Sequence, residues 1–184
     1  IIISKMKNIF NNSYKLNQFD FFFDTMSQYI SRNDTIYVEL DLMNFSPIDS
    51  NSITRYDFLE FFYQLFIELV GNKGNLIVPT FSYSWGENNP KKIFDVKNTK
   101  ALTGIFPNFI LQKKNSIRTM DPIFSTAAIG HDNNYLTNNG DNSFGKDSIF
   151  NKLFEMDAKL ISFGLNKFDP TFVHYVEQNY NENI

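Results

Sequence analysis

Cysteine is absent from the 184-residue sequence. Its absence excludes disulfide bonds, thiolate nucleophiles and cysteine-based zinc sites. A chain without cysteine suits the reducing cytoplasm, and the cytoplasm is the location we expect for this protein.

A strong charge of either sign and long apolar runs are also lacking. Lys and Arg number 17 against 20 Asp and Glu, which gives a formal net charge of −3. Proteins that bind nucleic acid or anionic membranes need a basic footprint, so we expect neither partner here. No apolar stretch reaches the roughly 18–20 residues that span a bilayer. The sequence leaves the oligomeric state open.

Aromatic side chains, in contrast, are abundant. They make up 17% of the residues, with 21 phenylalanines, and apolar residues as a whole make up 42%. A chain of this length and composition predicts a single folded domain over residues 1–184 with a sizeable core.

The spacing of the apolar residues predicts an α/β fold with a mostly parallel central sheet flanked by helices. β-Branched and aromatic residues predict core strands at Thr35–Leu40, Asn75–Pro79 and Ala158–Phe163. Helical stripes and caps predict helices at 17–31, Ser52–Val70, Thr103–Gln112, Ser148–Glu155 and Asp169–Gln178. The run 118–130 ends in a further strand-like segment, and polar loops are expected at 80–100 and 131–146.

Polar residues follow the predicted core strands at the point where each strand ends. The segments concerned are Asp41–Ser46, Thr80–Trp85 and Gly164–Pro170. In open α/β sheets, ligands bind beyond the carboxyl ends of the strands, so the three segments are expected to converge on one site. Taken singly, each has a simpler interpretation, because Asp41 suits a turn and the hydroxyls of Thr80 and Ser82 suit loop backbone.

His174 is the best candidate for proton transfer, since the chain has only two histidines. Glu177 follows it by three residues, which places both side chains on one helical face, where the carboxylate can orient the ring. The alternative is a core helix that tolerates one histidine. His131, in a polar stretch, is interpreted as a solvated loop residue.

Two further patterns admit both a functional and a structural interpretation. Arg118 either grips a phosphate or carboxylate, or forms a local ion pair with Asp121 in a turn before Pro122. His174, Glu177 and an aspartate would together supply enough ligands for zinc. Nothing in their spacing requires a metal, and we expect none.

Several segments, taken in order, resemble the aminoglycoside 3-N-acetyltransferase family. The segments are VELDL (Val38–Leu42), GNLIVPTFSYS (Gly74–Ser84), FDVKNTKALTGIFPNFI (Phe94–Ile110), RTMDPIFSTAAIG (Arg118–Gly130), Ser143–Gly164 and TFVHYVEQ (Thr171–Gln178). The last of these looks like the family's T-x-x-H-x-x-E motif, and RTMDPIFSTAAIG looks like its R-S-x-H-P signature.

The resemblance implies a mixed α/β enzyme that moves an acetyl group from acetyl-CoA to an amine of an aminoglycoside or amino sugar. It makes His174 the general base, with Glu177 and Asp41 as acidic partners. By position, it assigns the coenzyme to the segments that hold Leu42, Asn44, Thr80 and Ser82, and to the signature residues Arg118 and Ser125.

The chain departs from the family pattern in three places. Glu39 and Asp121 stand where relatives have histidine, and the sequence ends six residues after TFVHYVEQ. Family members continue further, so we expect the C-terminal part of the fold to be missing. Two alternatives therefore remain beside the acetyltransferase. The first is a truncated, non-catalytic remnant of the fold, and the second is a metal-dependent hydrolase.

Overall fold

The computed structural model describes residues 13–41, 54–86, 92–165 and 170–181. Within them, a five-stranded sheet has the order β3-β4-β2-β1-β5. The strands are β1 (Thr35–Leu40), β2 (Asn75–Pro79), β3 (Ile117–Arg118), β4 (Thr126–Gly130) and β5 (Lys159–Phe163). Strand β1 pairs in parallel with both β2 and β5, whereas β4 runs antiparallel to both β2 and β3. The predicted mixed α/β sheet is thus confirmed, and its core strands are the parallel ones.

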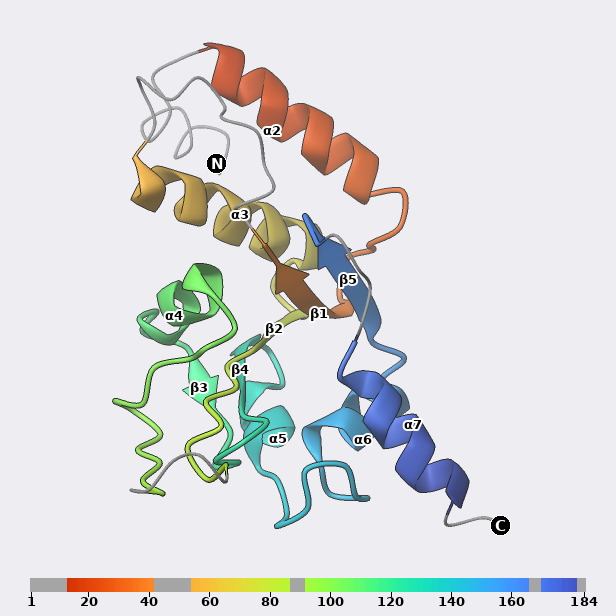
Figure 1. Cartoon of the computed structure of the whole chain (residues 1–184). Helices are drawn as coiled ribbons and strands as arrows, with labels where there is room; N and C mark the ends of the chain where they lie inside the picture. Colours follow the sequence, from red (N-terminus) through yellow and green to blue (C-terminus); the bar gives the residue numbers. More distant parts are fainter. Residues whose placement is uncertain (1–12, 42–53, 87–91, 166–169, 182–184) are drawn as a thin grey trace.

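Helices cover both faces of this sheet (Figure 1). They are α2 (Ser13–Met26), α3 (Arg55–Val70), α4 (Ile105–Leu111), α5 (Asn133–Thr137), α6 (Ile149–Glu155) and α7 (Phe172–Asn181). Helices α2, α3 and α4 pack on one face, and α5, α6 and α7 gather on the other. None of the helices in the described ranges is long and apolar enough to cross a membrane.

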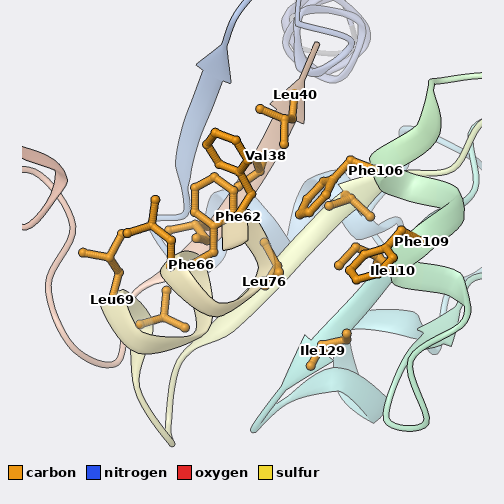
Figure 2. Close-up of a cluster of buried hydrophobic side chains, with 14 of the residues drawn as sticks. Val38, Leu40, Phe62, Phe66, Leu69, Leu76, Phe106, Phe109, Ile110 and Ile129 are labelled. Atoms are coloured by element: carbon orange, nitrogen blue, oxygen red, sulfur yellow. The ribbon is translucent and has the colours of Figure 1, made fainter. Parts of the chain in front are cut away.

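The larger core lies between the sheet and the first set of helices (Figure 2). Strand β1 contributes Val38 and strand β2 contributes Leu76, and both side chains are almost completely buried. Helix α3 contributes Phe62, whose ring meets those of Phe58 and Phe163 edge-on with centroids 5.1 and 5.4 Å away. This helix is apolar around most of its circumference because it is sandwiched between the sheet and its neighbouring helices.

The smaller core lies on the opposite face and fixes α6 and α7. Tyr37 of β1 packs there against Phe150 of α6, with ring centroids 6.1 Å apart. Tyr175 of α7 is also buried in this cluster, and its hydroxyl donates to Asn151 at 2.9 Å. Strand β1 is therefore covered on both faces, as expected for a central parallel strand.

Some boundaries differ from the sequence-based prediction. The cap of α3 is Thr54 and not Ser52, because Thr54 and Asp57 exchange the two hydrogen bonds of a capping box. Helix α2 runs from Ser13 to Met26, so it both begins and ends earlier than the predicted helix at 17–31. Helix α5 lies inside the predicted loop 131–146. The sequence offers Asp147 and Ser148 as caps of α6, and the cap is Ser148, since its hydroxyl accepts from the N–H of Asn151.

Replacing Phe62 by alanine should destabilise the protein strongly. Its ring is 1% exposed, and removing a buried Phe side chain typically costs about 3–5 kcal/mol in lost burial and cavity formation. Phe21→Ala is the matched control, because that ring is 66% exposed. Urea-induced unfolding followed by circular dichroism measures both. Equal losses for the two variants would contradict this assignment of the core.

Candidate active site

A pocket of about 600 Å³ opens at the carboxyl ends of the parallel strands. It is lined by Glu39, Leu40 and Asp41 from the end of β1, by Pro79 and Phe81 from the end of β2, and by Leu165 after β5. The three strand ends singled out in the sequence therefore do meet at one place. Parallel pairing of β1 with both neighbours is the reason, because it brings their carboxyl ends to the same edge.

The opposite wall of the pocket is the loop from Ala101 to Gly104 and the start of α4. The N–H of Leu102 donates to the carbonyl of Phe81 at 2.7 Å, and the Thr103 hydroxyl donates to the carbonyl of Pro79 at 2.6 Å. The Asn108 amide group holds the same loop through the carbonyls of Ala101 and Gly104. These bonds fix a mainly apolar wall against the end of β2. The sequence predicted α4 but not its part in a pocket.

A second, more basic hollow of about 680 Å³ adjoins this pocket. The two share Arg55 and Ile105, and the second is also lined by Lys97 and Lys100. The cationic side chains thus lie at one end of the mostly apolar pocket, while the carboxylates of Glu39 and Asp41 line the pocket itself.

Three of the predicted coenzyme residues, Thr80, Arg118 and Ser125, form one buried hydrogen-bonded network behind the pocket wall. Ser82 is buried as well. Arg118 donates through Nε to the hydroxyls of Thr80 and Ser125, both at 3.2 Å, and through a terminal nitrogen to the Thr80 carbonyl at 2.6 Å. Its other terminal nitrogen donates to the carbonyl of Thr99. The guanidinium therefore ties together three chain segments that are distant in sequence.

Arg118 is a buried cation that binds only neutral acceptors. In the described part of the chain, no carboxylate forms an ion pair with it, so the local pair with Asp121 is not present. Burial lowers the pKa of Arg118 to about 10, which still leaves the group charged at neutral pH. The face of Phe94 lies 4.9 Å from the guanidinium carbon and adds a favourable contact.

Ser82 lies one step further along the same segment. Its hydroxyl donates to the carbonyl of Pro122 at 2.9 Å, as does that of Ser84. Backbone N–H groups of Thr80, Ser82 and Ser84 also donate to carbonyls of the segment before β4, which extends the pairing of β2 and β4 beyond the sheet. Phe81, between Thr80 and Ser82, lines the pocket. Leu42 and Asn44, the remaining two predicted coenzyme residues, lie outside the described residues.

His174 and Glu177 come together on α7 as their spacing predicts. Nδ1 of His174 lies 3.1 Å from a carboxylate oxygen of Glu177, and the two side chains are 55% and 64% exposed. Since a carboxylate only accepts hydrogen bonds, Nδ1 carries the proton of the neutral ring and Nε2 keeps its lone pair. This tautomer suits a general base. Helix α7 is not among the described elements that line the 600 Å³ pocket.

An aromatic wall lies beside His174, and it had no signal in the sequence. Phe144 packs edge-on against the imidazole, with ring centroids 5.6 Å apart. Phe144 in turn contacts Phe124 at 5.0 Å, and Phe124 contacts Tyr83 at 6.1 Å. The row connects α7 to the segment that follows β2. Phe124 also contacts Phe81 of the pocket lining, with ring centroids 5.3 Å apart.

Tyr37 adds a buried hydroxyl on this side of the sheet. Burial raises its pKa well above the ordinary value, and the Glu39 carboxylate adds to the rise. The hydroxyl finds no hydrogen-bond partner within the described ranges. The Tyr37 hydroxyl therefore stays protonated and neutral. The neighbouring carboxylate belongs to Glu39, which stands where the family pattern has a histidine.

The described residues provide no support for a metal site. Among residues 13–41, 54–86, 92–165 and 170–181, no group of three histidine or carboxylate side chains is placed to hold a metal ion. Within these same ranges, His174 and Glu177 contact each other and no third such side chain joins them.

The family profile described as aminoglycoside 3-N-acetyltransferase matches residues 50–183. This range is well over half of the chain and contains most of the pocket lining, the buried arginine network and α7. The chain belongs to this family. No curated protein matches the sequence significantly.

Solved structures of aminoglycoside acetyltransferases have the same fold as this family member. AAC-VIa bound to sisomicin superposes with a TM-score of 0.68 at 20% identity, covering 84% of this chain and 64% of its own. The binary complex of AAC-IIIb with CoASH gives 0.69 at 18% identity, with 85% and 62% covered. YokD from Bacillus subtilis gives 0.66 at 15% identity, with 83% and 63% covered. The chain thus spans less than two thirds of the length of these structures.

Replacing Arg118 by methionine should lower the free energy of unfolding by about 2–4 kcal/mol, because buried carbonyl and hydroxyl acceptors lose a charged donor. Arg118→Lys should not restore the loss, since an ammonium group cannot reproduce the planar fork of donors. Arg32→Met is the control. That side chain is 71% exposed and makes one contact of 3.4 Å to Glu68, so its loss should cost less than about 1 kcal/mol.

Thermal and urea unfolding measure these variants. Unchanged stability of Arg118→Met would contradict a structural role, and it would favour the alternative that Arg118 serves a bound ligand.

Proposed function

We propose that this protein transfers an acetyl group from acetyl-CoA to an amine of an aminoglycoside or amino sugar. The observation that carries the proposal is the family match over residues 50–183, which includes most of the pocket lining and His174. The related structures with CoASH and with sisomicin support the two substrate classes. The cysteine-free sequence suits the cytoplasm, the location we propose for the reaction.

Acetyl-CoA fits the two adjoining hollows by shape and charge. The apolar pocket between β1, β2 and α4 would hold the pantetheine arm, with Leu102 and Ile105 against its aliphatic part. The basic hollow beside it would place Lys97, Lys100 and Arg55 near the coenzyme phosphates. In this arrangement, Thr80, Ser82, Arg118 and Ser125 act by holding the pocket wall, and Leu42 and Asn44 stay coenzyme contacts predicted from the sequence.

The chemistry needs one base. An ammonium group on the acceptor sugar must lose a proton before its nitrogen attacks the thioester carbonyl. Nε2 of His174 would take that proton while Glu177 holds Nδ1–H and stabilises the imidazolium that forms. The new C–N bond creates a tetrahedral intermediate. Its collapse breaks the C–S bond, and the coenzyme leaves as a thiolate, which takes up the second proton that the attacking nitrogen loses as it becomes the amide.

Carboxylates near the strand ends would favour a cationic acceptor. Glu39 and Asp41 both line the pocket at the end of β1. Negative charge there attracts ammonium groups and raises their local concentration. We therefore propose Asp41 as an acidic partner in acceptor binding, with Glu39 beside it.

Leu102→Asp should weaken acetyl-CoA binding. Leu102 lines the pocket and is 68% exposed, so the substitution is tolerated by the fold but places a charge against the pantetheine arm. We expect a loss of about tenfold or more in affinity, because an unpaired charge in an apolar contact costs more than about 1.4 kcal/mol. Ile93→Asp, at a similarly exposed site that lines neither hollow, should bind as the wild type does.

Calorimetric titration measures the affinity directly, and thermal unfolding provides a second test. Acetyl-CoA at 100 times its Kd should stabilise the wild type by about 2.7 kcal/mol. A flat response from the wild type would refute the coenzyme site and favour a non-catalytic remnant of the fold.

His174→Gln should abolish measurable transfer while leaving acetyl-CoA binding intact. Loss of a general base typically lowers kcat by about 10²–10⁴-fold. His131→Gln is the matched control, because it removes the other, exposed loop histidine. Thiol release from acetyl-CoA, with aminoglycosides and nucleotide-linked amino sugars as acceptors, measures both. Full activity of His174→Gln would remove the proposed base, and activity that disappears on chelation would favour the metal-dependent hydrolase.

A further inference from the structure

Asp121 lies at the junction of the two segments that carry the aromatic wall beside His174. One of its carboxylate oxygens accepts the backbone N–H groups of Ile123 and Phe124, both at 2.8 Å. The other accepts the hydroxyl of Ser143 at 2.5 Å. Hydrogen bonds to an ionised carboxylate are the stronger kind, so Asp121 holds the segment 121–124 and the segment around Ser143 together.

The two segments held by Asp121 each contribute a phenylalanine next to the bonded atoms. Phe124 supplies one of the N–H groups that Asp121 accepts, and Phe144 directly follows Ser143. Their rings contact each other at 5.0 Å. Phe144 then contacts the imidazole of His174 at 5.6 Å, with the ring planes at 61°. A continuous path of contacts thus runs from the Asp121 carboxylate to the ring of the candidate base.

His174 needs such support because little else holds its ring. The side chain is 55% exposed, and its hydrogen-bond partner Glu177 is 64% exposed. An exposed hydrogen-bonded pair of this kind holds a geometry weakly, since water competes for both groups. An aromatic wall on the other side of the imidazole restricts its rotation by contact and is not screened by water.

We propose that Asp121 and Ser143 are positioning residues that hold Phe144 against His174 and so fix the direction of the His174 ring. Neither touches the reacting atoms in this arrangement, so neither is a catalytic residue. The consequence for catalysis rests on the proposed function, but the arrangement of the rings can be tested without it. We call the bonds from Asp121 to Ser143, Ile123 and Phe124 the clamp. Its carboxylate stands at the position where the family pattern has a histidine.

The ring contact has a direct spectroscopic signature. Protons of an imidazole packed on a phenylalanine are displaced by its ring current, and this chain has only two histidines to resolve. In proton–carbon spectra of the imidazole groups, His131→Gln assigns the two sets of signals. Phe144→Leu should move the His174 signals to the position of an unshielded ring, and it supplies the reference for loss of the contact.

Ser143→Ala then tests the clamp itself. It removes the hydroxyl that reaches Asp121 but keeps the two backbone bonds, so the fold is expected to survive. The His174 signals should move toward their position in Phe144→Leu. Ser116→Ala is the control, because the Ser116 hydroxyl has no hydrogen-bond partner in the described part of the chain. Its His174 signals should stay at the wild-type position.

Two substitutions of Asp121 separate its geometry from its charge. Asp121→Asn keeps an oxygen for the two backbone N–H groups and offers an amide N–H to the Ser143 oxygen, so the His174 signals should stay close to the wild type. Asp121→Ala loses all three bonds and should give the displaced signals. If Ser143→Ala leaves the His174 signals unchanged, or if Phe144→Leu does not move them, the proposal is wrong.

Kinetics connect the clamp to the proposed reaction. Ser143→Ala should lower kcat about tenfold, since small misplacements of a catalytic group carry costs of this order. Its KM for acetyl-CoA should stay close to the wild-type value, because the clamp does not line the coenzyme pocket. If the wild type transfers no acetyl group, the proposed function fails, while the spectra still decide whether the clamp exists. Unchanged kcat with displaced signals would refute the positioning role.

Discussion

Strand β1 pairs in parallel with β2 along one side and with β5 along the other. The rest of the molecule depends on this arrangement. It buries β1 on both faces, which requires helices on each side, and it brings the carboxyl ends of three strands to one edge. The pocket forms there because residues at the ends of β1, β2 and β5 meet the loop before α4 at this edge. Glu39 and Asp41 are part of the pocket for this reason and not through any local motif.

A buried charge that has no charged partner in the described part of the chain supports the pocket from behind. Arg118 is stable there because its donors meet carbonyl and hydroxyl oxygens from several segments, which together replace the water it has lost. The network fixes the backbone on either side of Phe81, whose side chain lines the pocket. The network thus supports the pocket wall at Phe81, and its member Ser125 directly follows Phe124 of the aromatic wall next to His174.

Much of this arrangement was predictable from residue patterns. The core strands and a cap at Asp147 or Ser148 follow from short-range rules of periodicity and capping. The pairing of His174 with Glu177 follows from helical spacing alone. Other features were not predictable. The cap at Thr54 depends on which of several hydroxyl residues meets Asp57, and the helix at Asn133–Thr137 is too short and polar to give a periodic signal.

The sequence by itself determined which residue types were available for chemistry. It allowed one plausible base, excluded thiols, and set His174 and Glu177 on one helical face because that relation lies within a single turn. Only the tertiary structure decided what those residues meet. Phe144 and Asp121 are separated from His174 by tens of residues along the chain, and the hydrogen bonds and ring contacts that join them arise only when the loops pack. Contacts over such distances depend on the whole fold, which no local pattern encodes.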